Sequence, residues 1–236
     1  MIDKIMGSTA EAVVDVFDGA TILIGGFGAA GSPVELVHAL IEQGATNLTV
    51  VNNNAGSGRI GLAALIEAGR VAKVICSFPR TAGSDVFTRL YQQKRIKLEL
   101  VPQGTLAERI RAGGAGIPAF YTPTSAGTLL AESKEQRVID GKACVLEYAL
   151  KADFALIRSL RADRYGNLVY NKTARNFSPI MAAAAITTIV QTAEIVEPGD
   201  IDAEQVVTPG LFVNRIVHVE HAVHEGELLE RGAVYP

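Results

Sequence analysis

Short apolar runs rich in β-branched residues alternate with amphipathic stretches through the first half of the chain. Strands are predicted at Thr21–Ile24, Leu48–Val51, Ala72–Ser77 and Lys97–Val101. Helices are predicted at Pro33–Gln43, Gly61–Ala68, Ser84–Gln93 and Leu106–Arg111, several of them bounded by glycine or proline. This alternation is typical of βαβ units, so we predict an α/β fold built on an open, mostly parallel sheet flanked by helices. Ahead of it, Ser8-Thr9-Ala10-Glu11 has the residue types of a capping box and predicts the start of a first helix.

The pattern changes after Gly113. Residues 113–128 are rich in glycine, proline and threonine and predict an excursion or lid loop, and Asp140-Gly141 between two extended runs predicts a hairpin turn. Later strands are predicted at Ala155–Ile157, Leu168–Tyr170 and Thr188–Gln191, with a turn at Arg164–Asn167 and a helix near Ser178–Ala185. Because no repeat or linker-like boundary interrupts the chain, we predict a single domain, residues 1–236, with a smaller β-rich excursion.

Composition narrows the possible partners and compartment. The net charge of −3 argues against a nucleic-acid partner. Two cysteines are too few for a disulfide framework and fit a reducing cytosol. The longest apolar stretch, Ile180–Val190, is too short to span a bilayer, and Met1–Glu11 lacks the apolar region of an export signal. We therefore expect a soluble, cytoplasmic protein with no membrane partner.

A glycine-rich loop between a predicted strand and a predicted helix is the most informative local feature. Gly26, Gly28 and Gly31 have the spacing of a dinucleotide-binding fingerprint. A dinucleotide fold would place an acidic residue about 20 positions further on, to hold a ribose. The chain has Asn52-Asn53-Asn54 at that place. A dinucleotide or phosphosugar site and a merely tight strand–helix crossing both stay open on these residues alone.

The segment from Asp18 to Pro33 reads Asp-Gly-x-x, three apolar residues, Gly-Gly-Phe-x-x-x-Gly-x-Pro, and it resembles the N-terminal signature of family I coenzyme A (CoA) transferases. Further blocks agree with that family in order, at Asn53–Gly56, Pro102–Thr105, Arg109–Gly116 and Ala174–Phe177. The resemblance runs from about Ile5 to Val219 and leaves the residues after Val219 unexplained. Within the family, the chain resembles the A-type (alpha) subunits of 3-oxoacid CoA-transferases. This resemblance implies a Rossmann-like sheet. The run Cys76–Arg80 together with Leu106–Arg111 looks closest to the 3-oxoadipate branch, whereas Ala30 and Ser133 depart from many relatives.

The resemblance implies a ping-pong transfer of CoA from succinyl-CoA to a 3-oxoacid through covalent glutamyl intermediates. It implies a CoA thioester as substrate and no tightly bound cofactor. The family's nucleophilic glutamate lies in a Ser-Glu-Asn-Gly-like segment of the B-type subunit, and this chain has no such segment. The helical or charged contexts of Glu35, Glu67, Glu108 and Glu132 favour solvated side chains. A B-type partner subunit, in an α2β2 assembly, is therefore expected.

The resemblance also indicates which residues of this chain form the other wall of the site. It assigns substrate or CoA binding to the glycine loop, at Gly25, Gly26, Phe27, Gly28 and Gly31. Supporting catalytic roles go to Asn53, Asn54 and Gln103, whose uncharged amides can donate hydrogen bonds to an oxyanion. The alternatives are asparagines that bond their own turn and a glutamine exposed on a loop.

Arg80 and three histidines complete the candidates. Arg80 follows a predicted strand and could hold the second carboxylate of 3-oxoadipate, or else be solvated or paired at a subunit interface. His218, His221 and His224 are spaced by three, which does not bring three ligands together on a regular helix or strand. We predict no metal site.

Overall fold

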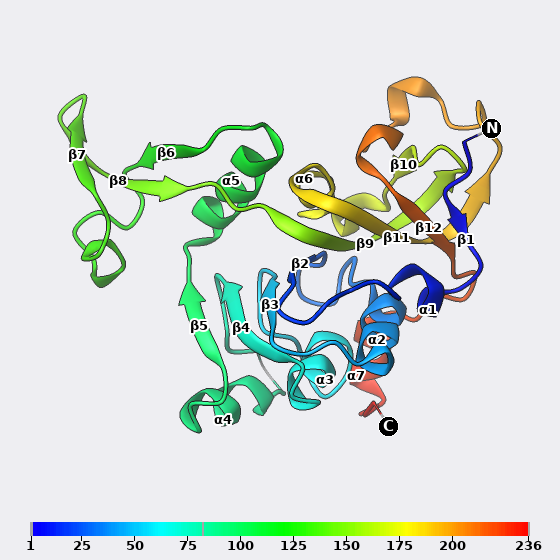
Figure 1. The fold of residues 1–236 in the computed structure, drawn as a ribbon, viewed down its shortest axis with the longest axis horizontal. Coiled ribbons are helices and arrows are strands. Elements are labelled where there is room, and N and C mark those ends of the chain that lie inside the picture. The colour runs from blue at the N-terminus through cyan, green and yellow to red at the C-terminus, as the bar shows by residue number, and fades with distance from the viewer. Residues whose placement is uncertain (1, 82, 236) are drawn as a thin grey trace.

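The computed structural model describes residues 2–81 and 83–235. Within them, nine strands form one sheet in the order β1-β12-β11-β9-β2-β3-β4-β5, with β10 added alongside β9 (Figure 1). The strands are β1 (Ile5–Met6), β2 (Thr21–Ile24), β3 (Leu48–Val51), β4 (Val71–Cys76), β5 (Lys97–Leu100), β9 (Ala152–Asp163), β10 (Leu168–Val169), β11 (Ala185–Val196) and β12 (Arg215–His218). Every pairing is parallel except that of β10 with β9, which confirms the predicted mostly parallel α/β sheet.

Helices cover both faces of the sheet (Figure 1). One face carries α1 (Thr9–Ala12), α2 (Val34–Gln43), α3 (Gly61–Glu67), α4 (Val86–Gln92) and α7 (Glu225–Glu230), and the other carries α5 (Gln103–Gly114) and α6 (Ser178–Ala184). Short 3₁₀ turns lie at Leu129–Ala131, Lys172–Arg175, Ala203–Gln205 and Gly210–Phe212. Along β2, Ile22 and Ile24 belong to the core on the first face and Leu23 to the core on the second. Burial on both faces explains why this strand is continuously apolar.

The capping prediction at the first helix is confirmed. The Ser8 hydroxyl accepts a hydrogen bond from the Glu11 N–H at 3.1 Å, and the Glu11 carboxylate accepts one from the Gly7 N–H at 2.9 Å. At the end of α2, Gly44 takes the left-handed conformation (φ 96°) and donates to the Leu40 carbonyl, as its position after the helix predicts.

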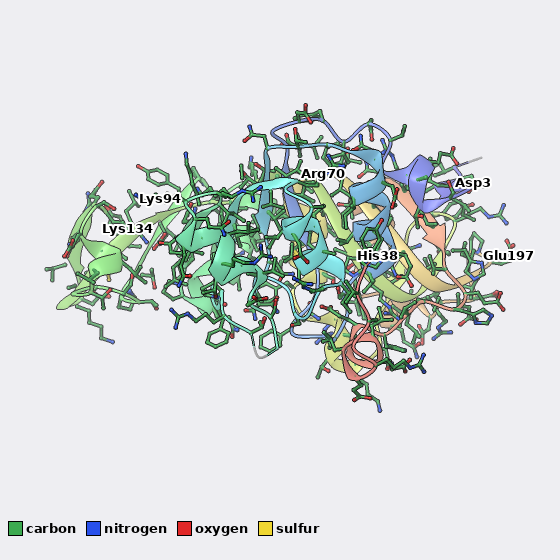
Figure 2. The ribbon with its side chains drawn as sticks, turned by 90° about the horizontal axis from the view of Figure 1, so that it is seen from below. Asp3, His38, Arg70, Lys94, Lys134 and Glu197 are labelled. Carbon is green, nitrogen blue, oxygen red and sulfur yellow. The ribbon has the colours of Figure 1, made fainter. Side chains whose placement is uncertain are left out.

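A second, antiparallel sheet of β6 (Ala119–Thr122), β8 (Lys142–Tyr148) and β7 (Gln136–Ile139) projects from the body (Figure 1). Lys134 marks this end of the molecule in Figure 2, and Glu197 the opposite end. The Asp140-Gly141 hairpin turn is confirmed, with positive φ at both residues. The lid loop predicted for 113–128 is wrong in part, because α5 extends into this stretch and β6 occupies four of its positions.

Strand lengths in the second half also differ from the prediction. Only the middle of β9 was predicted, because Arg158 and Arg161 interrupt its apolar run. The strand persists because it pairs with β11 at ten positions, a contact between segments distant in sequence. None of the helices in the two described ranges is both long and apolar enough to cross a bilayer.

Candidate functional site

The glycine loop follows β2 at the carboxyl edge of the sheet. Phe27 and Ala30 exchange backbone hydrogen bonds at 3.0 and 3.2 Å, which closes a four-residue turn around Gly28. Gly28 sits at φ +57°, a conformation that favours glycine. Phe27, one of the two residues that close the turn, is 47% exposed. The loop therefore presents backbone and one aromatic ring to whatever binds here.

Asn176, which was not predicted as a site residue, fixes the shape of this loop. Its side-chain oxygen accepts from the Gly26 N–H at 3.2 Å, and its amide nitrogen donates to the Ala30 carbonyl at 2.9 Å. Gly31 lies directly against the Ala174 carbonyl, so no side chain fits at that position. The block Ala174–Phe177, which signalled family resemblance in the sequence, thus acts as a support for the glycine loop.

The three consecutive asparagines at the end of β3 are buried, and two of them have clear structural roles. Asn52 donates to the Ile24 carbonyl at 2.7 Å and accepts from the Asn54 N–H at 2.9 Å, which ties the ends of β2 and β3 together. The Asn54 side-chain oxygen accepts from the Gly56 N–H at 2.8 Å. The side-chain oxygens of Asn52 and Asn54 therefore bond the backbone of their own turn, which is the alternative role considered from the sequence.

Asn53 instead joins three separate elements. Its side-chain oxygen accepts from the Ser77 hydroxyl, just past β4, at 2.7 Å and from Gln103 Nε2, at the start of α5, at 2.8 Å. Gln103 is exposed, but its hydrogen bond to Asn53 fixes the side chain, so it differs from the freely solvated loop amide considered from the sequence. The Asn53 amide nitrogen makes no hydrogen bond to any residue of the described ranges. The structure thus brings Asn53 and Gln103 together and leaves the Asn53 amide nitrogen without a partner in the described ranges.

Further along the same edge, one aromatic and one cationic residue are exposed. Phe78 pairs with Asn54 through a backbone bridge and is 62% exposed. Arg80 is exposed too, and it forms no ion pair with any residue described. Aromatic residues are enriched in protein–protein interfaces, so exposed Phe27 and Phe78 fit an edge that another molecule covers.

None of the four glutamates considered from the sequence reaches this edge as a free carboxylate. Glu67 forms ion pairs with Arg59 and Arg89, and Glu108 with Arg111, while Glu132 is exposed beyond the small sheet's 3₁₀ turn. The prediction of a solvated Glu35 is wrong. Its carboxylate accepts hydrogen bonds at 2.5 Å from Gln191 Nε2 and at 2.6 Å from the Val223 N–H, because the C-terminal segment folds back over α2.

The residues after Val219, unexplained by the sequence, dock beneath the glycine loop. Burial raises the pKa of Glu225 to about 7, and a hydrogen bond with the Ser32 hydroxyl of the loop offsets part of that rise. At the far end, the Tyr235 ring lies 4.4 Å from the ring of His38, which is labelled in Figure 2. This segment therefore stabilises the base of the loop.

The three histidines do not converge. His218 hydrogen-bonds the Ala193 carbonyl at 3.1 Å, whereas His221 and His224 lie beside a cavity behind the glycine loop. In the part of the chain that the structure describes, no group of three or more His, Cys, Asp or Glu side chains is placed to hold a metal ion.

A family model described as coenzyme A transferase matches residues 7–219. The chain is 58% identical to the A subunit of 3-oxoadipate CoA-transferase from Pseudomonas putida, covering 94% of this chain and 96% of that protein. It is 44% identical to the A subunit of a probable succinyl-CoA:3-ketoacid coenzyme A transferase from Bacillus subtilis, covering 91% and 89%.

Among solved structures, the acyl-CoA transferase YdiF of Escherichia coli O157:H7, as a thioester complex with CoA, superposes with a TM-score of 0.84 at 21% identity. The match covers 94% of this chain and 50% of YdiF, so this chain spans about half the length of that enzyme. At this identity the likeness concerns the fold alone.

Proposed function

The chain belongs to the coenzyme A transferase family, and we propose that it is the A-type component of an enzyme that moves CoA from succinyl-CoA to a 3-oxoacid. The single observation that carries the proposal is the 58% identity, over nearly the whole of both chains, to the A-type chain of a 3-oxoadipate CoA-transferase. The lower identity, 44%, to a succinyl-CoA:3-ketoacid relative favours 3-oxoadipate over acetoacetate or another short 3-oxoacid as acceptor. Residues 1–236 act together as this A-type unit.

A B-type partner supplies what this chain lacks. The carboxyl edge of the sheet carries amides, glycine backbone and exposed aromatic rings, while each glutamate considered above is paired, hydrogen-bonded or remote from that edge. The uncovered Phe27 and Phe78 support a partner that packs over this edge. We propose that the partner brings the nucleophilic glutamate and that the assembly is α2β2.

In this mechanism the partner's glutamate carboxylate attacks the succinyl-CoA thioester carbonyl, and CoA leaves as a thiolate. The thiolate then attacks the resulting glutamyl anhydride, which releases succinate and leaves a glutamyl–CoA thioester. The 3-oxoacid carboxylate reverses these steps and departs as the new CoA thioester. CoA is therefore bound as part of the substrate and not as a resident cofactor.

Each of these steps passes through an anionic tetrahedral intermediate that needs hydrogen-bond donors. Gln103 donates one of its two amide N–H groups to the Asn53 side-chain oxygen, so its main contribution is to orient Asn53. The unused Asn53 nitrogen is then the donor that faces the acyl group. Asn54 contributes mainly by shaping the turn that follows β3.

The proposal is tested with purified chains, alone and mixed. We expect no CoA transfer from succinyl-CoA by this chain alone and turnover once its B-type partner is added. Comparing kcat/KM for 3-oxoadipate and acetoacetate in the assembled enzyme then identifies the acceptor. Turnover by the isolated chain, free of host enzyme, would contradict the proposed division of labour.

A further inference from the structure

A cavity of about 430 Å³ lies beside the glycine loop, and Asn53 is not among its lining residues. Its walls are residues 29–31 of the loop, Arg158 and Ser159 of β9, the turn at 171–174 and the segment 220–224. Its volume is within the range of about 300–1,000 Å³ that small-molecule sites usually have. None of the residues assigned above to acyl transfer on β3, β4 or α5 lines it.

The cavity's position in the sheet is the first reason to regard it as a binding site. From β2 the chain builds the sheet outward through β3, β4 and β5, and then returns to the other side of β2 with β9, β11 and β12. The order of strands therefore reverses between β2 and β9. In open parallel sheets, ligands bind at the carboxyl ends of the strands where this reversal opens a crevice. The glycine loop after β2 and the extension of β9 form the two sides of that crevice.

The charge of the walls is the second reason. Arg158 and Lys172 both line the cavity, and neither forms an ion pair with a residue in the described ranges. Arg158 spends one guanidinium nitrogen on the Val223 carbonyl, at 2.9 Å, and keeps its other donors. His221 and His224 also border the cavity, whereas Glu220 is its only acidic lining residue among those described. The walls are therefore rich in hydrogen-bond donors and have an excess of positive charge.

A buried hydroxyl without a partner is the third reason. Ser159 is only 3% exposed, and its hydroxyl makes no hydrogen bond within the described part of the chain. Buried polar groups in folded proteins are nearly always paired, so this hydroxyl is free to donate to a ligand atom or water beside β9. The backbone N–H groups of Ala29 and Gly31 are likewise unbonded to any described residue.

We propose that this cavity is an anion-binding subsite that holds a carboxylate or phosphate group of a substrate, with Arg158 as its principal cation and the Ser159 hydroxyl as a further donor. The inference rests on the proposed transferase function, which supplies two sources of such a group: the phosphates of CoA and the distal carboxylate of a dicarboxylic 3-oxoacid. Because the glycine loop forms one wall, a bound anion would also hold that loop in place.

The test uses the complex of this chain with its B-type partner and two probes in isothermal titration calorimetry, coenzyme A and adipate. Arg158→Gln removes the cation, and Ser159→Ala removes the unpaired hydroxyl. Ser159→Ala breaks no hydrogen bond of the described chain, so we expect its thermal unfolding without ligand to match wild type. Lys94→Gln, in the exposed turn after α4, is the control for a general loss of positive charge.

We expect Arg158→Gln and Ser159→Ala each to weaken the binding of at least one probe by about tenfold or more. Lys94→Gln should leave the affinity for both probes unchanged. Weaker coenzyme A binding with normal adipate binding identifies a phosphate, and the reverse identifies the distal carboxylate; a loss for both probes indicates a shared anion subsite. Wild-type affinity of both variants for both probes would overturn the proposal. Turnover of the wild-type complex is measured separately, so a failed subsite and a failed transferase assignment give different results.

Discussion

Gly31→Ala should be far more damaging than Gly28→Ala, although both glycines lie in the same loop and both have positive φ. Gly28 is at +57° and Gly31 at +77°. A methyl group on Gly28 would meet no atom within 4 Å. A methyl group on Gly31 would overlap the Ala174 carbonyl and come within 2.9 Å of the Asn176 amide nitrogen.

The two substitutions share one cost and differ in another. Placing alanine in the left-handed region costs about 1–2 kcal/mol at either position. At Gly31 the backbone of the 172–176 turn must also move, and overpacking of this kind adds about 1–3 kcal/mol. The movement strains the hydrogen bonds that Asn176 makes to Gly26 and Ala30, which set the shape of the loop. We expect a total of about 2–5 kcal/mol for Gly31→Ala, against about 1–2 kcal/mol for Gly28→Ala.

Thermal unfolding of the two variants measures this difference. For a chain of this size, 1 kcal/mol corresponds to a change in Tm of about 2–4 °C, so the additional ~1–3 kcal/mol should make Gly31→Ala lower Tm by about 2–12 °C more than Gly28→Ala. In the assembled enzyme, Gly31→Ala should also lower kcat if the loop binds substrate as we propose. Equal Tm changes for the two variants would refute the argument that the 174–176 support is what demands glycine at position 31.

Three further predictions concern the site and its base. Asn53→Ala should lower kcat about a hundredfold, and Gln103→Ala should lower kcat more than it raises KM; a loss of Tm with kcat intact would show a purely structural role. Arg80→Ala should reduce kcat/KM about tenfold for 3-oxoadipate but not for acetoacetate, and an equal fall for both would exclude Arg80 from specificity. Burial raises the pKa of Glu225 from 4.5 to about 7, so the folded chain retains a proton that the unfolded chain releases. Stability should then fall by up to about 3 kcal/mol as the pH rises from about 4.5 through 7. Denaturant unfolding should show Glu225→Gln becoming more stable relative to wild type as the pH rises through that window. A stability difference that does not change with pH would contradict the raised pKa of Glu225.

The first half of the fold could be predicted from the sequence because its elements are specified locally. The strands Thr21–Ile24 and Leu48–Val51 have the predicted bounds, since each is a short apolar run buried on both faces. The second half depends on partners distant in the sequence. The strand Ile5–Met6 exists because it pairs with β12, more than two hundred residues later, and no local pattern marks two residues as a strand.

The site was predictable as a set of residues but not as a set of contacts. Resemblance indicated Asn53 and Gln103, and only the structure shows that one amide holds the other. Asn176 appeared in a family block without a role, because the atoms it bonds belong to a loop about 150 residues earlier in the chain. The docking of Glu225 beneath that loop lay outside the resemblance altogether, so burial in the folded chain was the only signal that could reveal it.

The hydrogen bonds of the asparagine run determine which kind of chemistry this wall can support. The side-chain oxygens of Asn52, Asn53 and Asn54 all accept hydrogen bonds from within the chain. The Asn52 nitrogen is also occupied, by the Ile24 carbonyl, whereas the Asn53 and Asn54 nitrogens have no partner among the described residues. The unused groups are therefore donors, and a wall of uncharged donors stabilises negative charge as it develops without pairing permanently with the ground-state acid. Such a wall cannot act as nucleophile or base, and in the proposed function the B-type partner supplies the carboxylate. The proposed oxyanion would then form between the donors of this chain and the carboxylate of its partner, which is how the catalytic parts can be divided between two chains.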